Sequence, residues 1–182
     1  MLESLKKTIQ LFFAGKRKIE SQQLGRIKNL SDASSIGLFF CIKSKGELVN
    51  IRNLLKKVRA SGKQVTVYVF FQGYQSLDVV TDKSLFFFNL NDFTLFAKMK
   101  DILKQQIQES SFDLLISFVQ SPDALCHLVS TKINAKFKVG AHQSDLSTVF
   151  DFTLETDLKD VGIEQFYQQV QDYLRVLNIE RK

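Results

Sequence analysis

The 182-residue sequence predicts a three-layer α/β fold with a mostly parallel sheet. Short runs of apolar, β-branched or aromatic residues alternate with segments of helical period from about Ser35 to the C-terminus. This alternation is typical of strand–helix–strand units, whose crossover helices cover both faces of a parallel sheet. Strands are expected at Ile36–Ile42, Val65–Phe71, Leu85–Leu90, Leu114–Val119, Lys136–Val139 and Val149–Leu154.

Amphipathic segments between and after these strands predict four helices. In the first, from about Glu47 to Ala60, apolar residues recur at helical spacing, and Gly62 supplies the stop. The other three are expected at about Phe93–Glu109, Pro122–Ile133 and Asp160–Ile179. Right-handed crossovers favour the strand order 3-2-1-4-5, with the sixth strand at the far edge. The predicted fold is therefore Rossmann-like, with a sheet of about six strands.

The first 33 residues are predicted to form an extra helix and a basic connection ahead of the Rossmann-like domain, which covers residues 34–182. Apolar residues recur at helical spacing from Leu2 to Phe13, which predicts a short amphipathic helix over residues 2–14. We expect this helix to pack on the sheet domain. The alternative is that it lies on an anionic membrane surface.

Positive charge is concentrated in the first third of the chain. Residues 1–63 carry 14 Lys and Arg against 4 Asp and Glu, whereas residues 64–182 carry 11 against 15. We expect a solvated basic face that keeps the protein soluble. The alternative is a surface for a phosphate-bearing partner, either nucleic acid or an anionic membrane, through the segment Lys6–Lys28.

Several classes of protein do not fit the composition. No stretch approaches the roughly 18 apolar residues of a membrane span, and the N-terminal apolar run has its basic residues on the wrong side for a secretory signal. Cys41 and Cys126 fall inside a predicted strand and helix, so both are expected to be buried free thiols in a cytoplasmic protein. Without a phosphate-loop, dinucleotide or zinc motif, no cofactor and no metal are expected.

Ligands of such sheets bind at the carboxyl ends of the strands, where the strand order reverses. Here that place lies between the first and fourth strands. The expected ligand-binding residues follow the first, fourth and fifth strands and are Lys43, Ser44, Lys45, Gly46, Gln120, Ser121 and His142. The loop at Lys43 opens a helix, so its N–H groups and two lysines predict a modest anion site.

Glu47 is the weak catalytic candidate in this loop. Ser44 and Glu47 have the spacing of a capping box, in which both side chains bind the amides at a helix start. We therefore expect Glu47 to cap the helix. The alternative is a general base, with Lys43 or Lys45 holding a phosphate.

Two short motifs resemble the N-terminal half of the heptosyltransferase-type glycosyltransferases. They are Phe112-Asp113-Leu114-Leu115-Ile116 and Ala135-Lys136-Phe137-Lys138-Val139-Gly140. That family has a Gly-Asp pair after its first strand, which corresponds to Gly46-Glu47, and the resemblance implies that the acid serves in catalysis. The nucleotide-sugar-binding half of the family has no counterpart in this sequence, so sugar transfer is not expected.

Over nearly its whole length the chain resembles an uncharacterised family of small proteins from Bacteroidetes. The shared marks are the basic N-terminal segment, the strand at Phe112–Ile116, the segment Asn134–Gly140 and the strand at Asp151–Leu154. This resemblance implies the fold and a cytoplasmic location and assigns no activity.

The function expected from the sequence is a non-catalytic binding or interaction module with an anion-binding cleft, because no nucleophile–base pair or metal set stands where this fold would place it. The alternative is an enzyme acting on a phosphorylated or nucleotide-linked small molecule. A third hypothesis is a nucleic-acid or membrane binder. We expect the partner to be an anionic small molecule or a protein. The sequence does not decide whether the chain forms a homodimer through an edge strand.

Overall fold

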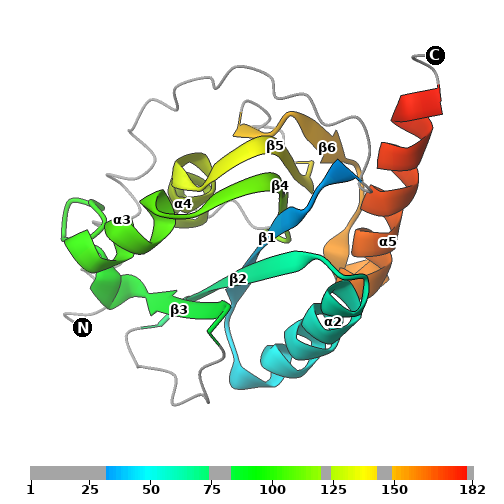
Figure 1. The fold of residues 1–182 in the computed structure, drawn as a ribbon. Helices are drawn as coiled ribbons and strands as arrows, with labels where there is room; N and C mark the ends of the chain where they lie inside the picture. Colours follow the sequence, from blue (N-terminus) through cyan, green and yellow to red (C-terminus); the bar gives the residue numbers. More distant parts are fainter. Residues whose placement is uncertain (1–31, 74–82, 120–123, 143–148, 180–182) are drawn as a thin grey trace.

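The computed structural model describes residues 32–73, 83–119, 124–142 and 149–179. Its six strands form one sheet in the order β3-β2-β1-β4-β5-β6, and every neighbouring pair is parallel (Figure 1). The predicted order and fold class are thus confirmed. The strands are β1 Ser35–Ile42, β2 Gln64–Phe71, β3 Leu85–Asn89, β4 Ser111–Ser117, β5 Asn134–Ala141 and β6 Phe152–Leu154. The helix expected at residues 2–14 and nearly all of the basic connection after it lie outside the described residues.

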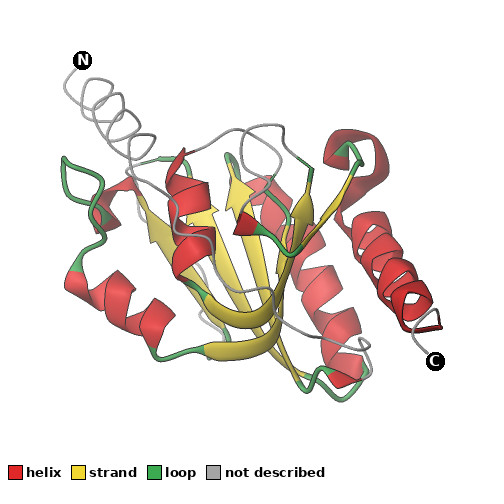
Figure 2. Cartoon of the chain, turned by 90° about the horizontal axis from the view of Figure 1, so that it is seen from above, coloured by secondary structure: helices red, strands yellow, loops and turns green. Residues whose placement is uncertain are grey.

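Helices cover both faces of the sheet (Figure 2). They are α2 Leu48–Ala60, α3 Asp101–Gln108, α4 Ala124–Lys132 and α5 Leu158–Ile179, with two 3₁₀ turns, η2 Lys45–Glu47 and η3 Leu90–Asp92. Helices α2 and α5 pack on one face, and α3 and α4 pack on the other. Residues of β1, β2 and β4 contribute to both cores, which explains why these strands are nearly continuous apolar runs.

The two cores differ in composition. The core beneath α2 and α5 is mainly aliphatic. The core beneath α3 and α4 is more aromatic, with Phe39, Phe70, Phe88 and Phe93 in contact through stacked, tilted and edge-to-face rings. Phenylalanine fills such a layer without a polar group that needs a partner, which accounts for its frequency in this chain.

The prediction of a helix over Phe93–Glu109 is wrong in its first half, because α3 begins only at Asp101. Phe93 is buried and pairs with Met99 in an antiparallel bridge. Between them, Thr94 N–H donates to the Lys98 carbonyl at 2.8 Å, and Lys98 N–H donates to Thr94 Oγ1 at 3.1 Å. These local bonds compete with the helical pattern, and Ala97 takes a positive φ of 56° to close the turn.

Helix α5 is interrupted near its start and buries one side. Gly162 has φ 75° and interrupts the helix after its first turn, a conformation that glycine adopts without steric penalty. Phe166, Val170 and Leu174 are buried against the sheet, whereas Tyr173 is 51% exposed.

Asp113 connects the amino-terminal parts of three neighbouring strands, β1, β4 and β5. Its Oδ2 accepts hydrogen bonds from the backbone N–H and hydroxyl groups of Ser34 (2.9 and 2.8 Å) and Ser35 (both 3.1 Å). Its Oδ1 accepts from Lys136 Nζ of β5 at 2.8 Å. The Lys136 ammonium, with the serine donors, holds the pKa of the Asp113 carboxyl well below its usual range.

We expect Asp113→Asn to lower the free energy of unfolding by about 1–3 kcal/mol at neutral pH, because bonds to a charged acceptor are lost. A depressed pKa stabilises the fold above the pKa of the unfolded chain, about 3.9, so the difference between the two proteins should shrink as the pH falls below that value. Urea unfolding at several pH values measures both effects. Asp172→Asn, on the exposed side of α5, is the control and should change little. An equal loss in both variants would contradict the role of Asp113.

Lys138 of β5 is a buried lysine that caps a helix. Its side chain is 1% exposed, and its Nζ donates to the carbonyls of Ser130 (2.9 Å) and Thr131 (3.1 Å) in the last turn of α4. Carbonyls in the last turn of a helix lack the N–H group four residues further on, so the ammonium stabilises the C-terminus of α4. Burial lowers the pKa of Lys138 to about 8, although nearby Asp151 acts in the opposite direction.

Because of Lys138, we expect the free energy of unfolding to depend on pH in the alkaline range. Between about pH 8 and 10.5 the unfolded chain holds a proton that the folded chain has released, so the free energy of unfolding should rise with pH, by up to about 3 kcal/mol. Lys138→Met should remove this rise, and Lys104→Met on the exposed side of α3 should keep it. Urea unfolding across this pH range measures the difference. Parallel curves for wild type and Lys138→Met would show that Lys138 titrates alike in both states.

Candidate functional site

The carboxyl edge of the sheet contains the point where the strand order reverses. β1 continues into α2 on one face, whereas the neighbouring β4 precedes α4 on the other face. Phe39 of β1 pairs with Ser117 of β4, and Ser117 pairs with Gly140 of β5, so the three strands reach this edge at one level. The loop from Lys43 to Glu47 therefore lies at the place where such folds bind ligands.

Glu47 caps the start of the helix in this loop. Its Oε1 accepts hydrogen bonds from the backbone N–H groups of Lys43 (2.9 Å) and Ser44 (2.8 Å) and from Ser44 Oγ (3.1 Å). The capping box expected from the sequence is present. These three hydrogen bonds occupy Glu47 Oε1, so this geometry opposes a role as general base.

Lys43, Lys45 and Gly46 are exposed beside this cap. Among the described residues, neither lysine forms an ion pair. The N–H groups of Lys43 and Ser44 already bind Glu47, so a ligand would meet the two ammonium groups and the remaining amides of the 3₁₀ turn. This arrangement suits a small anion.

The remaining predicted site residues fall into two groups. Gln120 and Ser121 lie outside the described residues. His142 is exposed directly after β5. Its backbone N–H donates to the Leu154 carbonyl at 2.7 Å, and its ring Nδ1 lies 3.5 Å from Thr153 Oγ1. One strand separates β5 from β1, which corresponds to about 10 Å between their backbones. The structure thus places His142 on the same edge as Lys43, two strands away.

Ser117 is a polar residue at this edge that was not among the site residues predicted from the sequence. Its side chain is fully buried on the side facing α4, and its Oγ has no hydrogen-bond partner within the described part of the chain. Next to it, the ring of Phe150 lies against Gly140 so closely that a Cβ there would come within 2.8 Å. No sequence pattern around a single serine could reveal this setting, because it depends on β1, β5 and a ring from a later loop.

The cysteine and histidine residues do not form a metal centre in the described ranges, where no cluster of three metal-ligating side chains occurs. Cys41 is a half-buried free thiol in β1 and Cys126 a buried one in α4. His127 is buried, at 1% exposure. Its packing matches the apolar surroundings of α4.

The fold and this edge define a Rossmann-like α/β protein with a capped, basic loop at the reversal of strand order. The chain belongs to a family of unknown function, DUF6913, whose model matches residues 4–177. The comparison with curated proteins gave no match, and neither did the comparison with solved structures. Within the described residues, no helix is both long and apolar enough to cross a membrane.

The buried hydroxyl of Ser117 gives a stability prediction. Ser117→Ala should raise the free energy of unfolding by about 1 kcal/mol, because the variant no longer buries a hydroxyl without a partner. Ser130→Ala is a matched control, since Ser130 is equally buried but its Oγ donates to the Cys126 carbonyl at 3.0 Å, so no gain is expected. Urea unfolding compares the two. A loss of stability in Ser117→Ala would mean that its hydroxyl is hydrogen-bonded in solution.

Proposed function

We propose that this chain is a non-catalytic binding module that holds an anionic ligand at the loop of Lys43, Ser44, Lys45 and Gly46. The single observation that carries this proposal is the state of Glu47. It is the one carboxylate of the loop, and its Oε1 binds the start of its own helix. The loop is therefore left with two exposed ammonium groups and without a free base.

The position of the loop supports the same proposal. It stands at the reversal of strand order, where open parallel sheets bind ligands, and at the positive end of the turn that leads into α2. The resemblance of β4 and β5 to a sugar-transferase half makes nucleotide sugars and sugar phosphates the first ligands to test. The two free cysteines agree with a reducing compartment, so we place the module in the cytoplasm.

A thermal-shift screen against orthophosphate, nucleotides, sugar phosphates and nucleotide sugars tests this proposal. A ligand at about 100 times its dissociation constant adds roughly 2.7 kcal/mol, which moves the midpoint by a few degrees. We expect a shift with a phosphate-bearing ligand that is lost in Lys43→Gln/Lys45→Gln. The control Lys98→Gln/Lys100→Gln has the same change of charge beneath the other sheet face and should keep the shift.

Two outcomes would contradict the proposal. A shift that survives in Lys43→Gln/Lys45→Gln would place the ligand elsewhere. Turnover of a ligand by wild type that disappears in Glu47→Gln would show that Glu47 acts as a base, because the amide oxygen of glutamine can still accept the capping bonds.

A further inference from the structure

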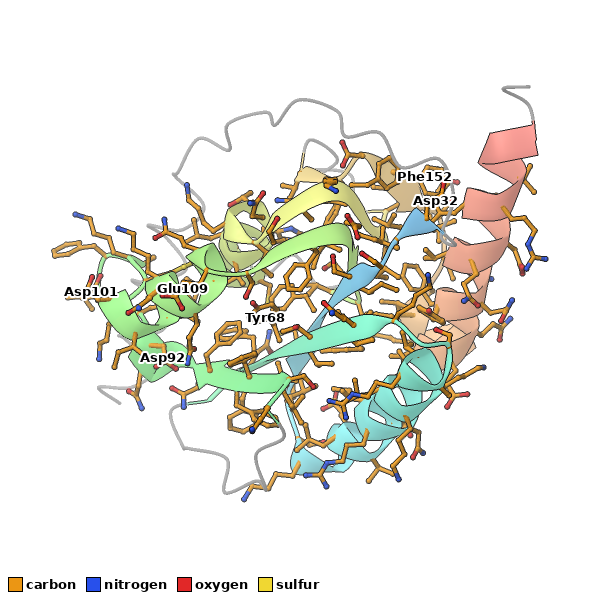
Figure 3. The ribbon with its side chains drawn as sticks, in the orientation of Figure 1. Asp32, Tyr68, Asp92, Asp101, Glu109 and Phe152 are labelled. Atoms are coloured by element: carbon orange, nitrogen blue, oxygen red, sulfur yellow. The ribbon has the colours of Figure 1, made fainter. Side chains whose placement is uncertain are left out.

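The outward side of α2 is basic along its length. Arg52, Lys56, Lys57 and Arg59 are all exposed, and we call these four residues the α2 basic face. Figure 3 shows side chains with nitrogen atoms at their tips on the outer side of this helix. Residues 43–63 contain seven Lys and Arg and a single acidic residue, Glu47. Half of the 14 basic residues in the first third of the chain therefore lie in this one segment.

Most of the charge of this face, on Arg52, Lys56 and Lys57, is not neutralised within the described part of the chain. Glu47 is held by the helix start, and no carboxylate there forms an ion pair with Arg52, Lys56 or Lys57. Arg52 and Lys56 are four residues apart, so they repel each other and cost the helix a few tenths of a kcal/mol. By contrast, α5 mixes its charges, with two basic and three acidic residues. The α2 basic face is thus a concentrated positive surface.

Spacing arranges these cations in a row. Arg52, Lys56 and Arg59 are separated by four and three residues, which places them on one side of the helix. At 1.5 Å per residue the row from Arg52 to Arg59 is about 10 Å long, enough to contact two neighbouring phosphates of a nucleic acid. Arg59 Nη2 also donates to Ser84 Oγ, just before β3, which orients the end of the row.

The side chains on and around the α2 basic face limit the kinds of polyanion that it can bind. The apolar side of α2 is buried against the sheet, from Leu48 to Val58, so this helix cannot insert it into a bilayer. Its exposed side offers Val49 and no aromatic residue, whereas protein interfaces and single-stranded nucleic acids both rely on aromatic contacts. Duplex DNA remains, because its regular backbone carries about one negative charge per 1.7 Å of helix axis and suits contacts to phosphate alone.

We propose that the α2 basic face binds the phosphate backbone of double-stranded DNA. The contacts are charge-assisted hydrogen bonds from Arg52, Lys56 and their neighbours to phosphate oxygens, and they carry no sequence preference. This surface is distinct from the loop proposed above for a small anion, and its test leaves Lys43 and Lys45 unchanged.

Fluorescence anisotropy with a labelled DNA duplex of about 20 base pairs tests the proposal in the full chain. Each phosphate contact contributes about 0.9 to the slope of log K against log salt. In Arg52→Gln/Lys56→Gln we expect a slope shallower by about 2 and an affinity roughly 50-fold lower near 0.1 M salt. Both side chains are exposed, so circular dichroism should show an unchanged fold.

Matched variants separate this surface from other basic segments. Lys98→Gln/Lys104→Gln, beneath the opposite sheet face, has the same change of charge and should bind DNA as wild type does. Equal losses in both variants would indicate net charge alone and overturn the proposal. So would full binding by Arg52→Gln/Lys56→Gln with loss in Lys6→Gln/Lys7→Gln. If Arg52→Gln/Lys56→Gln lost binding to phosphatidylserine vesicles but kept binding to DNA, the α2 basic face would be a membrane-binding surface instead.

Discussion

The parallel pairing of β1 with both β2 and β4 is the constraint on which the rest of the structure depends. β1 is the third strand of six, and five consecutive residues from Ile36 to Phe40 include four that are buried large apolar side chains. Gly37 completes this run, because a Cβ there would come within 2.9 Å of the Phe112 ring. The register of β1 therefore sets where β4 lies, and Asp113 fixes the same register from the amino-terminal side.

This register determines the geometry of the candidate site. A shift of one residue between β1 and β4 would turn every side chain of one strand to the other face and break both cores. With the register fixed, β1 and β4 end at the same edge, and the helices that follow them, α2 and α4, pack on opposite faces of the sheet. The exposed lysines at 43 and 45 thus owe their position to contacts at the far end of the strands, where Ser34 and Ser35 meet Asp113.

The sequence predicted the features that depend on local pattern. Strands buried on both faces are continuous apolar runs, and the box of Ser44 and Glu47 spans only four residues, so both could be recognised. The turn at Phe93–Met99 could not, because its residues suit a helix, and the turn depends on the Thr94–Lys98 hydrogen bonds together with burial of Phe93 in the core. The settings of Asp113, Ser117 and Lys138 also escaped prediction, since each is created by contacts between elements that lie far apart in the chain.

The two sides of helix α2 differ in what determines their residues. Packing on the sheet requires apolar residues on one side, and Leu48, Ile51, Leu54, Leu55 and Val58 satisfy it. Nothing in that packing requires the other side to be cationic, since mixed charges of the kind found on α5 keep a helix in solution equally well. The like charges of α2 weaken the isolated helix, and the DNA proposed above would offset this cost through its opposite charge. A face that only kept the protein soluble would not require charges of one sign.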